Sequence, residues 1–431
     1  MRSLRPLGFA LLFLALLEGA LRVLCDPDPR VLRDPLHPYG CFADAEQERL
    51  LRARAADAAP GAKRDTEGAE DVDVVLLGDS VLASTDNAPG ERLSDALSQA
   101  LPAALTAAAG GGKVRAPQVR VYTLAEGGAR AADQYAALRR LAAGLAALPA
   151  AAAGAPEASV SASGHGRRPL VILLSSNVLF YSQRHRQPAL LFPCLGDWLD
   201  DEPELRARLG LPAPAAGALL DRIERRLTVA LTRGLYLFQQ RRRVSERLFG
   251  GDGLPPRQAL RERLVASARR LHGSPSPSTA GEDVALRNRP WSERGLKPSQ
   301  FRAHYDLVPP GAPEATNLLA SAHLARYLGA HPELPVTVVE LAQNHALVGP
   351  WTASPAYAAL QDGLAARFTA AGVRVLRYDR HPALRSNDFI DQDHLSAEGN
   401  RRLAALLAAD LAPRLLAELS GRSDGTSAPS R

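Results

Sequence analysis

The sequence predicts an α/β protein built on a doubly wound, parallel sheet of five strands. Short apolar segments rich in Val, Ile and Leu alternate with segments in which leucines recur at helical spacing. Strands that are apolar along their whole length are typical of a parallel sheet covered by helices on both faces. The predicted strands are 72–77, 119–124, 170–174, 336–341 and 373–378.

Helices are predicted after most of these strands, because apolar residues recur there every three or four positions. The residues that define the helical faces are Leu93, Leu97 and Leu101; then Tyr135, Leu138, Leu141, Leu145 and Leu148; and finally Leu403, Leu407, Leu411 and Leu415. A further helix is expected at 356–371. The last helix begins beside Ser396, whose hydroxyl can cap it.

The length of 431 residues allows one large α/β domain with additions. We expect a stalk that contains one short helix, near 45–56, and an Ala/Gly/Ser-rich loop at 149–168. The expected segments are a signal anchor at 1–25, the stalk at 26–71, the sheet domain in two parts at 72–181 and 335–419, and a flexible tail at 420–431.

A large, mostly helical insertion is predicted between strands three and four, at 182–334. It contains a long candidate helix at 216–249 and a Pro/Ser-rich break at 274–278. The insertion is either a packing subdomain or a lid or substrate platform. The second interpretation arises because loops beyond the carboxyl ends of parallel strands surround the ligand crevice.

The composition argues against several classes of protein. Apolar residues make up 46% of the chain and charged residues 23%, as in a globular protein rather than a disordered or multi-span membrane protein. The net charge of +6 is spread along the chain and aromatic residues are only 5%, so nucleic acid is not an expected partner.

The cysteines are too few for a disulfide scaffold and lack the spacing of a zinc site. If the chain lies outside the cytoplasm, Cys25 and Cys41 are near enough in sequence to form a disulfide. Cys194 is then expected to be a buried thiol.

The amino terminus has a positive region followed by an apolar segment. Arg2 and Arg5 precede the apolar residues of 7–24, which as a helix would measure about 27 Å against about 30 Å for a hydrocarbon core. Glu18 can reach toward lipid headgroups or pair with Arg22 one turn later. Small residues are missing at a cleavage site, so we expect an uncleaved anchor with the rest of the chain outside. A cleaved signal peptide and an ordinary apolar helix are the alternatives.

Gly78, Asp79 and Ser80 follow the first predicted strand directly and precede a helix. A serine in this position is exposed at the carboxyl edge of the sheet, beside a helix amino terminus that favours negative charge. The same tripeptide is also a common turn that caps a helix. The tripeptide alone therefore does not decide between the two interpretations.

A possible base for this serine lies near the other end of the chain. Asp391 stands three residues before His394, which is the spacing that lets a carboxylate turn back to the Nδ1 atom of the ring. Together with Asp393, these residues can alternatively form a loop of solvated carboxylates or part of a metal site.

A serine nucleophile also needs hydrogen-bond donors for the oxyanion that forms during acyl transfer. Gly128, after the second strand, can bring its N–H close, and Asn177, after the third, can offer its amide. The N–H of Ser80 would be the third donor. Gly127 is the alternative to Gly128.

These four blocks resemble those of the SGNH/GDSL hydrolase superfamily, in which Ser, Gly, Asn and His stand in this order. The resemblance covers 72–181 and 335–419 and implies a sheet of SGNH or flavodoxin-like type. It also implies that Ser80 is the nucleophile, His394 the general base and Asp391 its orienting partner. Gly128, Asn177 and the N–H of Ser80 would form the oxyanion hole.

The resemblance implies a serine esterase that acts through an acyl-enzyme intermediate without a metal or organic cofactor. With the expected amino-terminal anchor, this predicts a membrane-anchored, extracytoplasmic esterase. The expected substrate is an ester or an acylated polysaccharide. The anchor, the site and the large insertion together also resemble DltD-like and alginate-acetylation proteins, which act in acyl transfer. Transfer of an acyl group to an envelope polysaccharide is therefore the alternative. A non-catalytic assembly protein is the third, and Ser80, Asp391 and His394 argue against it.

Several other polar and aromatic residues have structural interpretations. Asn344, after the fourth strand, is expected to cap the strand end rather than act as a second amide donor. Trp291 and Trp351 are expected to pack in the core or a lid rather than line a sugar or acyl site. Four histidines that lack a carboxylate arrangement like that of Asp391 and His394 are expected at the surface or in helix packing, and these are His304, His323, His345 and His381.

Overall fold

The computed structural model describes residues 5–24, 43–57, 72–110 without 85 and 89, 117–148, 168–182, 193–211, 227, 230–231, 234–240, 289–307 and 315–423. The chain divides into two compact units. One, here called the sheet unit, consists of Phe42–Leu211 and Ala280–Arg431. The other, the amino-terminal unit, consists of Met1–Cys41 and Pro212–Thr279.

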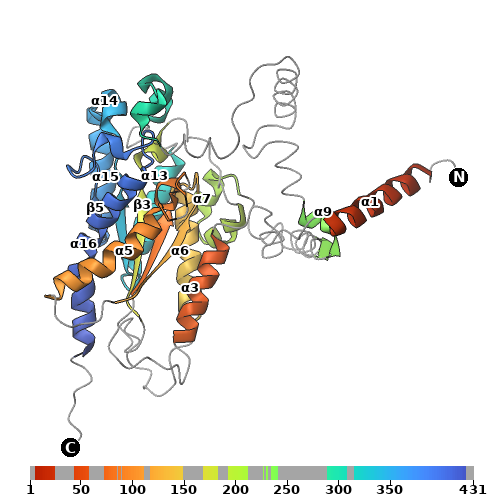
Figure 1. Ribbon diagram of the computed structural model, residues 1–431, viewed down its shortest axis with the longest axis horizontal. Helices are drawn as coiled ribbons and strands as arrows, with labels where there is room; N and C mark the ends of the chain where they lie inside the picture. Colours follow the sequence, from red (N-terminus) through yellow and green to blue (C-terminus); the bar gives the residue numbers. More distant parts are fainter. Residues whose placement is uncertain are drawn as a thin grey trace, which may run out of the picture. The chain divides into compact units, whose positions relative to one another are not determined.

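The sheet unit contains a parallel sheet of five strands with helices packed on it (Figure 1), which confirms the predicted α/β class and the parallel five-stranded sheet. The strand order is β2-β1-β3-β4-β5. The strands are β1 Val72–Gly78, β2 Val119–Ala125, β3 Leu170–Ser176, β4 Val336–Glu340 and β5 Arg374–Arg377. Leu77 of β1 pairs with Leu124 on one side and Leu174 on the other. The carboxyl ends of these three strands are therefore level at one edge of the sheet.

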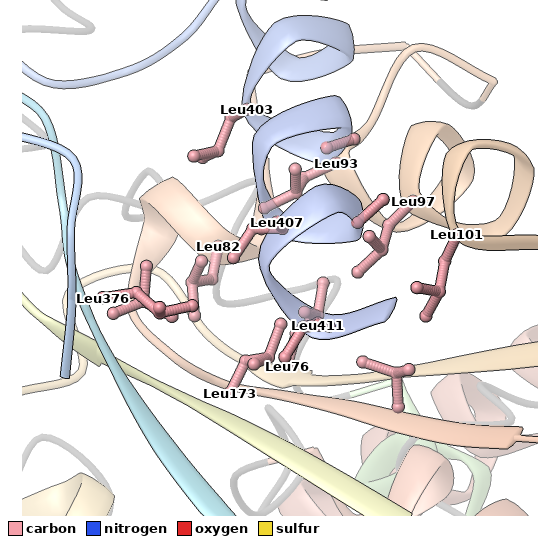
Figure 2. Packing of buried hydrophobic residues seen from close by; sticks show 14 of the residues in the cluster. Leu76, Leu82, Leu93, Leu97, Leu101, Leu173, Leu376, Leu403, Leu407 and Leu411 are labelled. Atoms are coloured by element: carbon pink, nitrogen blue, oxygen red, sulfur yellow. The ribbon is translucent and has the colours of Figure 1, made fainter. Parts of the chain in front are cut away.

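Two helices cover one face of the sheet with the leucines that the helical spacing predicted (Figure 2). They are α5 Leu93–Ala108 and α16 Ala397–Ser423. Their inward side chains are fully buried against β1, β3 and β5, and they include Leu93, Leu97, Leu101, Leu403, Leu407 and Leu411. The Ser396 hydroxyl accepts the N–H of Gly399 at 3.2 Å, which confirms the predicted cap of α16.

Successive strand residues point to opposite faces, so Val75 and Leu77 of β1 are buried on the other side of the sheet. Helices α6 Ala131–Ala146, α13 Thr316–Ala330 and α15 Pro355–Ala370 also belong to the sheet unit. Tyr135 of α6 and Tyr357 of α15 are almost completely buried. Because β1 is buried along its whole length, its sequence is apolar except for Asp73.

Helix α3, Asp44–Asp57, confirms the short helix expected near 45–56 but corrects its assignment to a stalk. Leu50 is completely buried, and Arg54 donates to the buried carboxylate of Asp73 in β1 at 2.8 Å. Arg120 of β2 donates to the same carboxylate at 2.7 Å. The helix is therefore attached to the sheet by a buried ion-pair cluster.

The chain between β3 and β4 returns repeatedly to the sheet unit. It includes η1 Val178–Tyr181, η3 Pro193–Leu199, α7 Pro203–Arg208, η4 Trp291–Arg294 and η5 Pro298–His304. Ser182 and Leu307 form an isolated antiparallel bridge, which joins the two ends of this excursion. Several predicted features lie mostly or wholly outside the described residues. These are most of the helix 216–249 and of the loop 149–168, the break at 274–278, Cys25, Cys41 and the side chain of Cys194.

In the amino-terminal unit, helix α1 spans Arg5–Leu24. Glu18 pairs with Arg22 at 2.9 Å, which confirms the expected pairing one helical turn apart. Its carboxylate also accepts the N–H groups of Tyr236 and Leu237. Among the residues that the structure describes, no helix has the length and apolar character needed to cross a membrane. The anchor at 1–25 stays a prediction.

Candidate active site

Ser80 is the first residue of the short helix α4, Ser80–Ala83, directly beyond β1. Asp79 caps this helix, because its carboxylate accepts the N–H of Val81 at 3.3 Å. A side chain at Gly78 would place its Cβ 2.2 Å from Ser175 Oγ, so the close approach of β3 requires glycine. The tripeptide is thus a helix-capping turn that also presents a partly exposed serine at the sheet edge.

His394 lies on the loop that precedes α16, and this loop is closed by backbone hydrogen bonds. Phe389 and Leu395 form an antiparallel bridge, and the N–H of Ile390 donates to the carbonyl of His394 at 2.9 Å. A Cβ at Gly399 would lie 2.2 Å from the Asp388 carbonyl oxygen, so glycine is needed where α16 passes the loop.

The structure brings the three predicted catalytic residues into direct contact. His394 Nε2 lies 2.8 Å from Ser80 Oγ, and His394 Nδ1 lies 2.9 Å from Asp391 Oδ2. Asp391 Oδ1 also accepts the backbone N–H of His394 at 2.8 Å and that of Asp393 at 3.1 Å. The carboxylate is therefore fixed on the loop before it meets the ring.

The charges of this cluster shift the acidity of the base. Burial acts to lower the pKa of His394, but the negative charges of Asp393 and Asp391 raise it well above its usual value. Burial likewise acts to raise the pKa of Asp391, and the charge and hydrogen bonds of His394 hold it below its usual value. The two carboxylates therefore stabilise the positive charge that the ring acquires when it takes a proton.

Gly128 lies three residues beyond Ala125, which pairs with Gly78 in the sheet. Its φ of +80° is in the left-handed region that favours glycine. Within the described part of the chain, the N–H groups of Ser80 and Gly128 donate to no protein acceptor. Both are therefore available to a ligand beyond this edge.

Asn177, the remaining predicted oxyanion donor, has both amide hydrogens engaged. Its Nδ2 donates to Asp79 Oδ2 at 2.8 Å and to Asp393 Oδ2 at 2.9 Å. Its Oδ1 accepts the N–H of Leu179 at 3.1 Å. The structure thus joins Asn177 to the residues next to Ser80 and His394.

The loop that carries His394 is held by residues whose roles the sequence analysis did not identify. Asn344 has no side-chain hydrogen bond that caps α14, His345–Thr352. Instead its Nδ2 donates to the carbonyl oxygen of Asp391 at 3.0 Å, and its backbone N–H donates to the carbonyl oxygen of Gln392 at 2.8 Å. The sequence signal for this role of Asn344 is its position just after the fourth predicted strand.

Trp291 and Trp351 pack as expected, and Trp291 also binds the His394 loop. Its backbone N–H donates to the Phe389 carbonyl and its Nε1 to Ser386 Oγ at 2.7 Å. Arg294 donates to the Ile390 carbonyl at 2.7 Å. Trp351 stacks on Tyr305 with ring centroids 5.8 Å apart.

Two of the remaining histidines also lie near carboxylates, and one of them, His323, is buried in helix α13, in agreement with the expected helix packing. His345 Nε2 lies 2.8 Å from Asp379 Oδ1, and its Nδ1 lies 2.8 Å from the hydroxyl of the buried Thr352. His323 Nδ1 lies 2.6 Å from Glu202 Oε2. These partners are far away in sequence, so local spacing could not reveal them.

The alternative interpretation of the Asp391–His394 loop as part of a metal site can be set against these contacts. Asp86, Asp391 and His394 form a group whose possible ligand atoms lie within 4.8 Å of one another. Both ring nitrogens of His394 are already taken, by Ser80 and by Asp391. A metal ion would have to displace one of these two hydrogen bonds, so the contacts present favour proton transfer.

A comparison with protein-family models found no match to the chain, and a comparison with curated proteins found none either.

Proposed function

We propose that the protein is a serine esterase of the SGNH type that cleaves carboxylic esters through an acyl-serine intermediate. The observation that carries the proposal is the continuous hydrogen-bonded chain from Ser80 Oγ through His394 to Asp391. A nucleophile, a base and an orienting carboxylate in this order are what acyl transfer to serine requires. The finer fold assignment, SGNH or flavodoxin-like with an insertion at 182–334, belongs to the same proposal.

In the proposed reaction, His394 Nε2 takes the Ser80 proton while Oγ attacks the ester carbonyl carbon. The imidazolium then gives its proton to the leaving alcohol, and the acyl group remains on Ser80. A water molecule then attacks the acyl carbon while His394 takes its proton. The imidazolium returns this proton to Ser80 Oγ as the bond from carbon to Oγ breaks and the acid leaves. Asp391 holds the Nδ1 proton in place throughout.

The oxyanion would be held first by the N–H groups of Ser80 and Gly128, since neither has a protein acceptor within the described residues. Asn177 can be the third donor only if it releases Asp79 or Asp393. The proposed reaction uses no metal or organic cofactor.

Transfer of the acyl group to a hydroxyl of an envelope polysaccharide is the second candidate. It is favoured by the chain between β3 and β4, whose segment 289–307 binds the His394 loop through Trp291 and Arg294. Chain placed against the site can exclude water, which favours an alcohol acceptor. For either reaction we propose an anchored, extracytoplasmic location. Recovery of the chain from cells without its first 24 residues would refute the anchor but not the export.

The test uses a fluorophosphonate probe and a small activated acetate ester on the full-length protein. We expect stoichiometric labelling of Ser80 and ester turnover, both lost in Ser80→Ala. Ser98→Ala, which removes a serine that bonds only to the Asp95 carbonyl in α5, is the matched control and should keep both. Labelling that persists in Ser80→Ala would overturn the assignment. Mass analysis with an added polysaccharide then separates hydrolysis from transfer.

A further inference from the structure

The Nδ1 atom of His394 faces carboxylate oxygens from two residues. Asp391 Oδ1 and Oδ2 lie 3.0 Å and 2.9 Å away, and Asp393 Oδ1 lies 3.2 Å away. A serine nucleophile and its base need one orienting carboxylate. The second carboxylate is therefore not explained by the proposed reaction.

Asp393 is buried in an unusual electrostatic position. Its side chain is only 5% exposed, and its Oδ1 has no hydrogen-bond donor among the described residues. A buried acceptor without a donor costs about 1–3 kcal/mol, and more when it carries a charge. The nearest group able to compensate is the ring of His394, which becomes positively charged when it takes the Ser80 proton.

The position of Asp393 is set by Asn177. The amide of Asn177 is oriented at its oxygen end by the Leu179 N–H, and its two hydrogens go to Asp393 and to Asp79. Asp79 in turn caps the helix that carries Ser80. One amide therefore ties the carboxylate beside the base to the turn that carries the nucleophile.

We infer that Asp393 is a second positioning carboxylate for His394, held by Asn177 beside the Nδ1 atom and able to accept the Nδ1 proton when Asp391 is lost. The inference rests on the proposed function. When the Ser80 proton moves to Nε2, the ring keeps its Nδ1 proton and the positive charge lies between two carboxylates. Loss of Asp391 then leaves a carboxylate that can still orient the ring.

The first experiment is a double-mutant cycle on kcat/KM for a small activated ester, with Asp391→Asn, Asp393→Asn and the double variant. Loss of a sole orienting carboxylate costs about 10⁴-fold, so a shared role predicts a smaller loss, of roughly 10²–10³-fold, for Asp391→Asn. Asp393→Asn should cost roughly tenfold in the wild type and clearly more in the Asp391→Asn background. Asp362→Asn, which removes an exposed carboxylate paired with Arg377, is the control and should change nothing.

An Asp393→Asn effect that is no larger in the Asp391→Asn background than in the wild type would overturn the inference. So would a loss near 10⁴-fold for Asp391→Asn alone, because it would leave no compensating role for Asp393.

The second experiment does not depend on turnover or on the folding of Asp393→Asn. In proton NMR spectra, the His394 Nδ1 proton bonded to a carboxylate gives a resonance far downfield. We expect it to persist, shifted, in Asp391→Asn, because Asp393 accepts the proton. Its disappearance there would overturn the inference. A wild-type protein without labelling or turnover would refute the proposed function, while this resonance would still test the carboxylate pair.

Discussion

Asn344 donates its side-chain amide to the carbonyl oxygen of Asp391 at 3.0 Å, and so connects the end of β4 to the loop that carries the base. The Asn344 side chain is completely buried, and its Oδ1 accepts the hydroxyl of Ser386 at 3.1 Å. The carboxylate of Asp391 thus contacts the His394 ring, while the backbone carbonyl of the same residue is bonded to Asn344. Asn344 therefore links the segment after β4 to the loop that carries His394, together with the bonds from Trp291 and Arg294.

We predict that Asn344→Ala lowers kcat by roughly 10–100-fold with little change in KM, since a displacement of about 1 Å at a reacting group can cost about 10²-fold. Two partly buried polar groups lose a partner, so the free energy of unfolding should also fall by about 1–3 kcal/mol. Asn317→Ala is the matched control, because Asn317 is a buried asparagine that donates to the Phe180 carbonyl at 2.7 Å. It should lose similar stability and keep its kcat. Equal losses of kcat in both variants would contradict the role of Asn344.

Asp79 should make the stability of the sheet unit depend on pH. Burial raises the pKa of Asp79 to about 6 from an ordinary value of 3.8. Its stabilising contribution is therefore complete below about pH 4 and lost as the pH rises through about 6, because the folded state then has to carry the buried charge. At about 1.4 kcal/mol for each tenfold change in acidity, the contribution is about 3 kcal/mol.

The measurement is urea unfolding of the wild type and Asp79→Asn between pH 4 and pH 7. The stability of the variant relative to the wild type should rise by up to about 3 kcal/mol across this range, since asparagine does not titrate. Asp362→Asn, at an exposed site, should give a constant difference. A constant difference for Asp79→Asn as well would show that Asp79 ionises normally.

The sheet, the helices that cover it and the contact between Asp391 and His394 could be predicted because their signals are local. Fully buried strands are apolar along their length, and leucine spacing marks the faces of α5 and α16. Ser80 follows a strand directly, and Asp391 reaches His394 across three residues. Each of these relations lies within one element or one loop.

The rest depends on contacts between distant parts of the chain. Asn177 meets Asp393 across 216 residues, and His345 meets Asp379 across 34, so no sequence spacing reveals either pair. Asp73, by contrast, is a local signal in the sequence for a buried ion pair. A carboxylate inside an apolar strand needs a buried cation, which here comes from α3 and explains why that helix is not part of a stalk.

The cluster around Asp73 should therefore dominate the attachment of α3. We predict that Asp73→Asn lowers the free energy of unfolding by about 3–5 kcal/mol, because Arg54 and Arg120 lose their shared counter-charge. The activity of the folded protein should not change, since Asp73 lies seven residues from Ser80 at the other end of β1, roughly 20 Å away. Glu48→Gln breaks the exposed pair with Arg52 and should cost less than about 1 kcal/mol. A loss for Asp73→Asn as small as that control would show that apolar contacts alone hold the helix.

The last prediction concerns the part of the insertion that belongs to the amino-terminal unit. The Ser182–Leu307 bridge closes the excursion at its base, and Trp291 and Arg294 hold the catalytic loop. A deletion that tests the lid hypothesis must keep these segments. Replacing Pro212–Thr279 by a short Gly/Ser linker does so, because this stretch lies outside the sheet unit.

If the deleted stretch is a substrate platform, the shortened protein should melt cooperatively and hydrolyse a small activated acetate at nearly the wild-type rate. Activity on an acylated polysaccharide should fall by roughly 10²-fold or more, because binding energy from remote contacts orients a large substrate at the reacting carbon. Circular dichroism comes first, and loss of the cooperative transition would make the stretch a structural element instead. A folded variant with unchanged activity on both substrates would refute the platform. The small ester isolates the contribution of the triad and the oxyanion donors, so the ratio of the two activities measures what the deleted stretch contributes.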